Sequence, residues 1–317
     1  MNNQGNKYVL VTAAYNEEAY IERTIQSIVA QTVLPERWAI VSDGSTDRTD
    51  DIVNSYATRY SFIQLVRITE EHPRNWAAQV FAINRGCKEL QNLDFQFLGN
   101  VDSDVSFEPE YFSTLLKRFE QNPDLGLAGG YIYERRNGQF EVRDMNSERS
   151  VAHAVQMFRR ECFETIGGYL ALPHGGPDWY ALVCARMHGW QVKAFPDLPV
   201  HHYRPSGSAD RPFPGLFRQG RMDYALGSYP PFEVLKIVRR FRSKPYVIGA
   251  LVRLSGFLLG YIRREKRPVS QEFVRYLQYE ESTRVRALFG LGPRPLPQQI
   301  GNRTRTRDSS DSPASLS

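Results

Sequence analysis

The chain is built around the stretch Phe95-Gln-Phe-Leu-Gly-Asn-Val-Asp-Ser-Asp104, in which a short apolar run leads directly into two aspartates one residue apart. Side chains alternate along a strand, so Asp102 and Asp104 would point the same way where a strand ends. Two carboxylates this close repel each other, and burying them without partners is costly. Mg²⁺ or Mn²⁺ relieves the repulsion, because these ions prefer oxygen ligands and leave room for phosphate oxygens. Alone, the pattern is common and more often a solvated Asp-Ser-Asp turn.

Apolar runs and helical stripes alternate along the chain before this stretch. Runs suited to buried strands stand at 8–12, 38–41, 62–68 and 95–101. Helices are predicted between them, at a stripe beginning with Ile21 and Ile25, around 52–56 and at 75–90. Asn16 is expected to cap the first helix. The alternation predicts βαβ units and an α/β fold with a doubly wound, mostly parallel sheet.

Polar clusters follow three of the predicted strands. They stand at 15–17, 42–47 and 102–104. In doubly wound sheets, ligands bind at the carboxyl ends of the strands, where the strand order reverses. Three clusters at one sheet edge favour a nucleotide site, which none of them would indicate alone.

The second half is less regular. A helix is expected at 109–119, a strand at 125–133, and a strand followed by a short glycine-stopped helix at 157–169. Another helix is expected at 181–188, and a strand-like segment at 192–195. His201 and His202 follow a further strand-like segment, and they are either ordinary surface residues or members of the site.

Composition narrows the setting of the protein. The 317 residues carry a net charge of +5, which suits an anionic surface or a phosphate-bearing substrate without choosing between them. The three cysteines are scattered without metal or disulfide spacing, which favours a reducing cytosol. Residues 1–7 lack the apolar core of a signal peptide, so we expect a cytoplasmic protein.

The character of the chain changes near residue 231. Residues 246–262 are strongly apolar, interrupted by Arg253, and have arginines and lysines on both sides. A membrane span takes about 20 apolar residues, so this segment is marginal. It is either a helix lying in a membrane interface or a helix packed on the preceding domain. We expect a flexible N-terminus (1–7), a main domain (8–230), a helical extension (231–290) and a largely disordered tail (291–317).

Five short motifs occur in a familiar order. They are Val11-Thr-Ala-Ala-Tyr-Asn-Glu-Glu18, Val41-Ser-Asp-Gly-Ser-Thr-Asp47, Asp102-Ser-Asp104, Gly167-Gly168-Tyr169 and Pro177-Asp178. By these motifs the chain resembles the family 2 glycosyltransferases over roughly residues 8–230. The resemblance implies a GT-A fold for that domain and a nucleotide-sugar donor, with UDP, dTDP and GDP sugars all open.

The resemblance also assigns roles to residues of the first two motifs. The base and ribose would be held by Ala13, Tyr15 and Glu17. Asp43 would accept the base N–H. The family more often has a second acid before this aspartate, where this chain has Ser42.

A divalent metal, Mn²⁺ or Mg²⁺, is implied as the cofactor. Asp104 would be its main protein ligand, and Asp102 would lie near the ribose or a metal-bound water. His202, with His201 in reserve, would approach the metal or the diphosphate.

The catalytic base is implied at Asp178. The family more often has a Glu-Asp pair at this place, whereas this chain has Pro177-Asp178. One carboxylate suffices, because a positioned aspartate that accepts a proton contributes about 10²–10⁴-fold. The alternative role for Asp178 is that of a helix N-cap.

The resulting hypothesis is a metal-dependent, inverting glycosyltransferase at the inner face of the cytoplasmic membrane. It would pass a sugar to a saccharide or lipid-linked acceptor in cell-envelope or exopolysaccharide assembly, and no nucleic-acid partner is expected. A sugar-phosphate nucleotidyltransferase is a second interpretation, but the loop 13–17 lacks the glycines that such a phosphate cradle uses. The third is an inactive nucleotide-binding or scaffold protein of the same fold, which the missing acids leave open.

Overall fold

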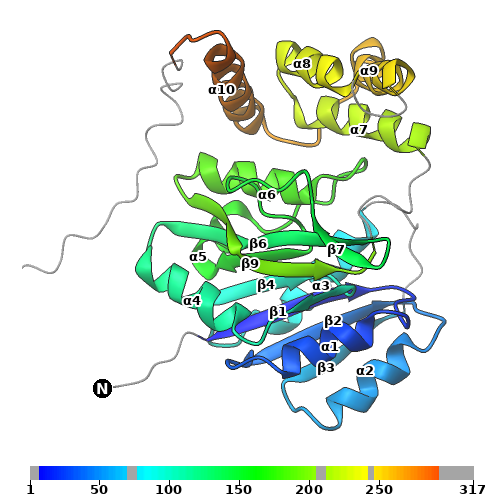
Figure 1. Ribbon diagram of the computed structural model, residues 1–317, viewed down its shortest axis with the longest axis vertical. Helices are drawn as coiled ribbons and strands as arrows, with labels where there is room; N and C mark the ends of the chain where they lie inside the picture. Colours follow the sequence, from blue (N-terminus) through cyan, green and yellow to red (C-terminus); the bar gives the residue numbers. More distant parts are fainter. Residues whose placement is uncertain (1–6, 70–76, 205–211, 242–245, 293–317) are drawn as a thin grey trace, which may run out of the picture.

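The computed structural model describes residues 7–69, 77–204, 212–241 and 246–292, and Figure 1 labels its elements. Within these residues, a nine-stranded sheet has the order β3-β2-β1-β4-β8-β6-β9-β5, with β7 paired to β6. The strands are β1 (Tyr8–Ala14), β2 (Arg37–Asp43), β3 (Ile63–Ile68), β4 (Phe97–Val101), β5 (Val105–Phe107), β6 (Leu125–Arg136), β7 (Gln139–Val142), β8 (Val155–Arg159) and β9 (Gln191–His202). The helices are α1 (Ile21–Val29), α2 (Thr49–Ala57), α3 (Ala78–Leu90), α4 (Tyr111–Gln121), α5 (Arg160–Ile166), α6 (Pro177–Met187), α7 (Pro212–Leu226), α8 (Pro230–Arg240), α9 (Tyr246–Ile262) and α10 (Gln271–Leu288).

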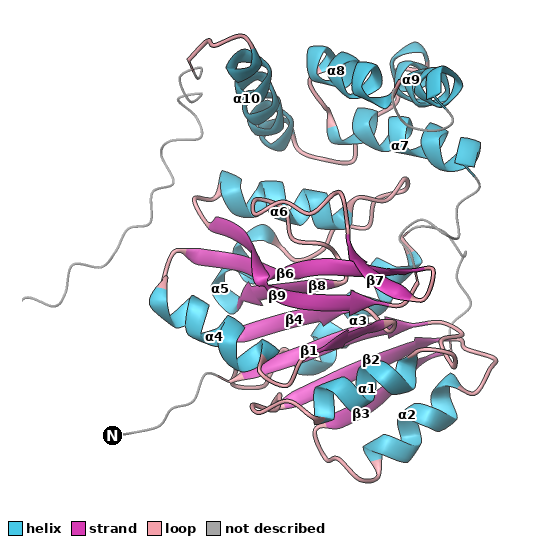
Figure 2. Cartoon of the chain, in the orientation of Figure 1, coloured by secondary structure: helices cyan, strands magenta, loops and turns pink. Residues whose placement is uncertain are grey.

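Helices cover both faces of the sheet, as Figure 2 shows. Along β1, Tyr8 and Leu10 enter one core cluster with residues of α1, α2 and α4. Val9 and Val11 enter a second cluster with residues of α3, α5 and α6. A strand buried on both faces needs apolar side chains at every position, which explains its continuous apolar run. The predicted doubly wound α/β fold is confirmed.

The first four strands of the sheet are parallel. β1 pairs in parallel with β2 and β4, and β2 pairs in parallel with β3. Their carboxyl ends therefore meet at one edge, where the three polar clusters stand. The other half of the sheet mixes directions, because β8 runs antiparallel to both β4 and β6, whereas β6 and β9 are parallel.

Several strands and helices begin or end at other residues than the sequence predicts, and two strands were not predicted. The sequence does not predict β5 or β7, since strands of three and four residues are too short to show a period. The strand expected at 192–195 extends over Gln191–His202, with an irregularity opposite Gly130 and Tyr131. The helix expected at 181–188 begins at Pro177. Gly167 ends α5 in the left-handed conformation (φ 73°), as the predicted glycine stop requires.

Helices α7 to α10 form a further layer beyond α6 (Figure 1). α9 packs along α7 and touches α8, whereas α10 contacts α6 and α8. In the described part of the chain, no helix combines the length and the apolar character needed to cross a membrane. Of the predicted termini, residues 1–6 and 293–317 lie outside the described residues.

Candidate functional site

A cavity of about 610 Å³ lies at the carboxyl ends of β1, β2 and β4. It is lined by Ala13, Ala14, Tyr15, Glu17, Asp43, Ala78, Gln79, Ala82, Asp102, Ser103, Asp104 and Arg204. The three polar clusters thus converge on one space. Six residues were expected around the nucleotide and the metal at the ends of β1, β2 and β4, and all six line this cavity. His202 is not among the lining residues but contacts Asp104.

Asn16 ties the first two polar loops together. Its backbone has a positive φ of 54°, and its side-chain Oδ1 accepts a hydrogen bond of 2.8 Å from the Thr46 backbone N–H. One residue later, the Glu17 N–H donates to Thr49 Oγ1 at 2.8 Å. The prediction that Asn16 caps α1 is wrong, because its oxygen is used by the neighbouring loop and the helix begins only at Ile21. These bonds hold Tyr15 and Glu17 at the cavity.

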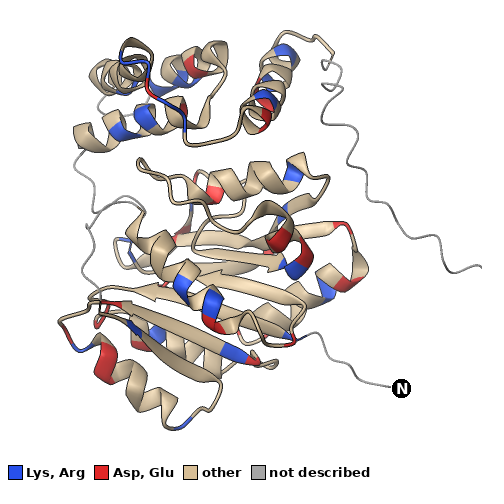
Figure 3. Ribbon diagram, turned by 180° about the vertical axis from the view of Figure 1, so that it is seen from behind, with Lys and Arg blue, Asp and Glu red and all other residues tan. Residues whose placement is uncertain are grey.

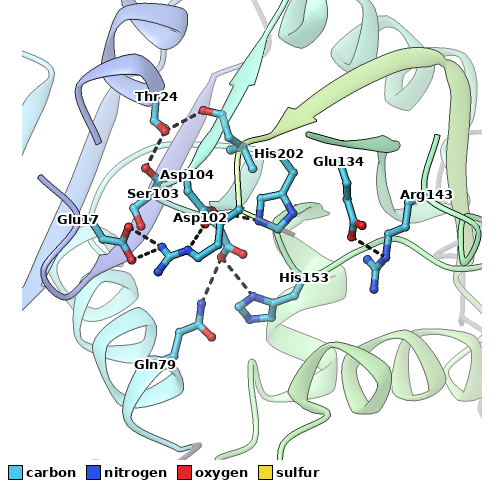
Figure 4. A network of polar contacts seen from close by, with 12 residues as sticks. Glu17, Thr24, Gln79, Asp102, Ser103, Asp104, Glu134, Arg143, His153 and His202 are labelled. Atoms are coloured by element: carbon cyan, nitrogen blue, oxygen red, sulfur yellow. Dashed lines mark hydrogen bonds and ion pairs between the residues drawn. The ribbon is translucent and has the colours of Figure 1, made fainter. Parts of the chain in front are cut away.

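Asp104 is the centre of a buried charged group, shown in Figure 4. Its Oδ1 lies 3.2 Å from His202 Nε2, and its Oδ2 accepts a bond of 2.9 Å from Arg204 Nε. Arg204 Nη2 also donates to both carboxylate oxygens of Glu17 at 2.5 Å. Antiparallel pairing of β5 with β9 places Val105 opposite His202 and so brings Asp104 to the histidine.

The electrostatics of this group favour the charged forms of Asp104 and His202. Burial raises the pKa of Asp104, but His202 and Arg204 outweigh it and hold the pKa below its usual value. Burial lowers the pKa of His202, but Asp104 outweighs it and the pKa is raised. For Glu17 burial dominates and raises the pKa, although Arg204 opposes the shift. Asp104 and His202 therefore stabilise each other's charged forms, and Arg204 places a further positive charge between Asp104 and Glu17.

Arg204 is a site residue that the sequence analysis missed. The signal was its position two residues after His202, which places it on the same side if the strand direction continues. His201 points elsewhere, since its ring packs 4.6 Å from that of Phe140. Of the two histidines, the structure thus brings His202 to Asp104.

Asp102 has its own partners. Gln79 Nε2 donates to its Oδ1 at 3.2 Å, and His153 Nδ1 lies 3.4 Å from the same oxygen (Figure 4). Burial lowers the pKa of His153, but Asp102 outweighs it, Asp178 adds to the effect, and the pKa is raised. Both carboxylates thus raise the pKa of His153. No local sequence pattern identifies this histidine as part of the site.

Asp178 lies in the first turn of α6. The helix begins at Pro177 and its N-cap residue is Gly176, so the N-cap interpretation of Asp178 is wrong. The charge of Asp178 acts on His153 and also on Tyr169, whose pKa is raised by burial first and by Asp178 next. Asp178 therefore acts electrostatically on His153, the partner of Asp102, although it is not among the residues that line the cavity.

The donor atoms fit a divalent cation. The Oδ1 of Asp104 and the Nε2 of His202 lie 3.2 Å apart, and carboxylate oxygen and imidazole nitrogen are both donor types that divalent metals accept. The other ring nitrogen of His202, Nδ1, is buried without a hydrogen-bond partner in the structure. In the present arrangement, no set of three or more His, Cys, Asp or Glu side chains among the described residues surrounds a common metal position. Binding would therefore require the Asp104–His202 contact to open.

Comparison with known proteins assigns the family. The sequence profile of glycosyl transferase family 2 matches residues 9–173. The chain belongs to this family. GlyA, a glycosyltransferase of Streptococcus pneumoniae, is 28% identical over 136 residues, which cover 43% of this chain and 18% of that protein. Chondroitin synthase of Pasteurella multocida is 27% identical over 171 residues, covering 49% of this chain and 16% of that protein. The region of this chain that matches thus spans less than a fifth of the length of each of these two relatives.

Solved structures share the fold. A mannosyltransferase of Pyrobaculum calidifontis, in complex with GDP-Man and Mn²⁺, superposes with a TM-score of 0.55 at 15% identity over 89% of this chain and 81% of that one. TarS of S. aureus, in complex with UDP-GlcNAc, gives 0.51 at 14% identity over 93% and 82%. The family 2 chain therefore has the GT-A fold of a glycosyltransferase, as the motifs predicted.

Proposed function

We propose that this glycosyltransferase transfers a sugar from a nucleoside-diphosphate sugar to a saccharide or lipid-linked acceptor, with inversion at the anomeric carbon and with a divalent metal. The observation that carries the proposal is the convergence of Asp43, Asp102 and Asp104 on one cavity at the ends of parallel strands. His202 and Arg204 add cationic charge beside it. Such a cavity suits a ligand with a base at one end and a diphosphate at the other.

The nucleotide would lie along β1 and β2. Tyr15 is 46% exposed at the cavity and offers a ring face for the base, whereas Asp43 is only 5% exposed and presents an acceptor for a base N–H. Ala13 and Glu17 border the same space. The fold relatives were captured with GDP-Man and UDP-GlcNAc, so guanine and uracil donors are both candidates, and dTDP sugars remain a third.

The diphosphate would lie at the acidic end of the cavity. Asp104, Asp102 and His202 would hold Mn²⁺ or Mg²⁺, which neutralises the charge that develops on the departing nucleoside diphosphate. Arg204 supplies a second positive charge at the same place, because its guanidinium is 39% exposed while it bridges Glu17 and Asp104. The carboxylates fix the orientation of this guanidinium toward the cavity.

Asp178 would serve as the general base. Its carboxylate would accept the proton of the acceptor hydroxyl as the oxygen attacks the anomeric carbon opposite the leaving group. His153 contacts Asp102, and Asp178 helps to raise its pKa, so it would link the base electrostatically to the donor side of the cavity. One carboxylate performs the step without the acid that the family more often has at Pro177.

The acceptor would be met at the inner face of the cytoplasmic membrane, in assembly of an envelope or extracellular polysaccharide. Two relatives are named as chondroitin synthase and hyaluronan synthase, both enzymes that make polysaccharide chains. The basic, apolar segment around α9 supports a peripheral membrane contact.

The test is calorimetric binding of UDP, dTDP and GDP, each with and without Mn²⁺, to the wild type and to Asp104→Ala. Binding of one nucleotide that depends on Mn²⁺ and is lost in Asp104→Ala is the expected result. Asp94→Ala is the matched control, because Asp94 is 80% exposed and pairs with Lys7 at the surface. Absence of binding under every condition would refute the proposal, whereas binding without any transfer in a donor and acceptor screen would favour an inactive scaffold.

A further inference from the structure

The outward side of α9 is mostly apolar and is interrupted by the exposed Ser255. Val247, Leu251, Leu254, Leu258 and Ile262 follow one another at intervals of three or four residues and share one helical stripe. Val247 is 52% exposed, Leu251 54%, Leu258 45% and Ile262 76%. Isolated apolar residues on a surface are ordinary, but a continuous stripe marks a contact surface.

The inward side of α9 packs closely against α7 through glycines. A Cβ on Gly256 would stand 2.2 Å from the Phe217 carbonyl oxygen, and one on Gly220 would stand 2.0 Å from the Arg253 carbonyl oxygen. The two backbones therefore touch at positions where only glycine fits. Because the two backbones approach so closely there, this side of α9 has no room for large side chains, and large aliphatic side chains of α9 lie on the opposite side.

The distribution of charged and apolar residues around α9 is the opposite of that in an ordinary surface helix. Arg253 points inward, where its Nη2 donates to Asp223 at 2.6 Å and its Nε lies 3.1 Å from Glu233. An ordinary surface helix turns its apolar stripe to the core and its charges to water. Here the single charged residue of the helix is 15% exposed, whereas Leu251 and Leu258 are exposed, so the outer side of α9 is suited to a medium less polar than water.

Helix α8 extends this surface. Val234, Val238 and Phe241 are spaced as one stripe and are 56%, 53% and 41% exposed. α8 contacts α9, and both lie on the far side of α7 from the sheet (Figure 1). We call the apolar stripes of the two helices, in which Leu254 is half-buried and the other residues are exposed, the α8–α9 face; they consist of Val234, Val238, Phe241, Val247, Leu251, Leu254, Leu258 and Ile262.

Basic residues border the α8–α9 face. Arg239 at the end of α8, and Arg263 and Arg264 after α9, are exposed, and the sequence has no Asp or Glu between residues 234 and 264. Figure 3 shows blue Lys and Arg segments among these helices. A pocket of about 760 Å³ beside the end of α9 is lined in part by Arg264, Lys266, Arg267 and Arg275, and also by Glu265, which pairs with Arg221. The rim is therefore suited to phosphate groups.

We propose that the α8–α9 face docks on the surface of an anionic lipid bilayer, with its aliphatic side chains among the acyl chains and its basic rim at the headgroup phosphates. A helix with an apolar side and a basic border binds in this way. A second copy of the chain fits less well, because a two-fold contact would set the same arginines against each other. The proposal deepens the proposed function, from which it takes the membrane location of the acceptor.

The experiment is cosedimentation of the full chain with vesicles of phosphatidylcholine alone and of phosphatidylcholine mixed with phosphatidylglycerol. The wild type should bind the anionic vesicles more tightly than the neutral ones. Leu251→Glu/Leu258→Glu should lower the affinity at least about tenfold, because two side chains leave the apolar contact. Arg263→Glu/Arg264→Glu should lower it on anionic vesicles only. Val142→Glu/Met145→Glu is the matched control, since these residues are exposed by 51% and 74% on another part of the surface.

Three results would overturn the proposal. They are failure of the wild type to bind anionic vesicles, equal binding by the Leu251→Glu/Leu258→Glu variant, and a wild-type dimer in sedimentation equilibrium that this variant abolishes. Circular dichroism establishes that each variant is folded. Nucleotide binding is measured on the same samples: vesicle binding without nucleotide binding leaves the docking proposal standing and refutes the proposed function, and the reverse result refutes docking alone.

Discussion

The cavity and the helical layer both bury charged residues, but they do so in opposite ways. At the cavity, Asp104 and Glu17 are almost covered, whereas their partner Arg204 is 39% exposed. In the helical layer, Glu233 and Asp223 are 1% and 7% exposed, and their partners Lys236 and Arg253 only 24% and 15%. One cluster is open to a ligand and the other is closed between helices.

This difference separates function from stability. An open cluster can exchange an internal ion pair for contacts with a ligand, so changes there should alter binding and turnover first. A closed cluster leaves a buried charge without a partner when one member is removed, which chiefly affects folding. The following substitutions test that division.

Asp104→Asn should have the largest effect. It removes the carboxylate on which His202 and Arg204 converge, and it weakens charge stabilisation worth several kcal/mol. Release of nucleoside diphosphate from the donor should fall by about 10³–10⁵-fold. The measurement is a steady-state assay with the donor identified by binding, with Asp94→Asn as control. If the variant kept wild-type turnover, Asp104 would have no role in the reaction.

Asp178→Asn should lower turnover by about 10²–10⁴-fold, because the amide cannot accept the proton of the acceptor hydroxyl. Nucleotide affinity should stay at the wild-type value, since Asp178 is not among the residues that line the cavity. Calorimetry and a transfer assay on the same preparation separate the two quantities. Reduced affinity with unchanged turnover would contradict the role of base.

Glu233→Ala should destabilise the protein by about 3–5 kcal/mol, because it leaves buried Arg253 and Lys236 with too little negative charge. Glu233 Oε1 lies 3.1 Å from Arg253 Nε, and Oε2 lies 2.6 Å from Lys236 Nζ. Urea unfolding measures the loss, with the exposed Glu36→Ala as control. Nucleotide affinity should not change in the folded variant; a loss of affinity without a loss of stability would show that the closed cluster serves the site.

Glu281 makes the stability of the helical layer depend on pH. Burial raises its pKa to about 7, although Lys236 and hydrogen bonds from Tyr229 and Ser228 oppose the shift. A raised carboxyl pKa stabilises the folded protein below the ordinary value of 4.5, and this contribution is lost as the pH rises toward 7. Between pH 5 and pH 8 the wild type should therefore lose about 1–3 kcal/mol relative to Glu281→Gln. Equal pH dependence of unfolding in the two proteins would contradict this.

Short-range patterns in the sequence determined the parallel half of the sheet and the edge at which its carboxyl ends meet. The runs beginning at Tyr8, Trp38 and Phe95 are mostly apolar and do not alternate with polar residues, because strands covered on both faces need no polar side. Asp43, Asp102 and Asp104 follow such runs directly, so their place at the carboxyl ends of parallel strands could be predicted. These features depend only on residues close together in the chain.

Tertiary packing decided everything that depends on distant partners. Arg204 reaches Glu17 across 187 residues, and His153 stands beside Asp102 through the pairing of β4 with β8. The apolar run of α9 was evident, but its outward side was set by glycines that let α7 approach and by the buried acids that draw Arg253 inward. Helical periodicity specifies which residues share a side, and only the contacts with other elements specify which side is buried.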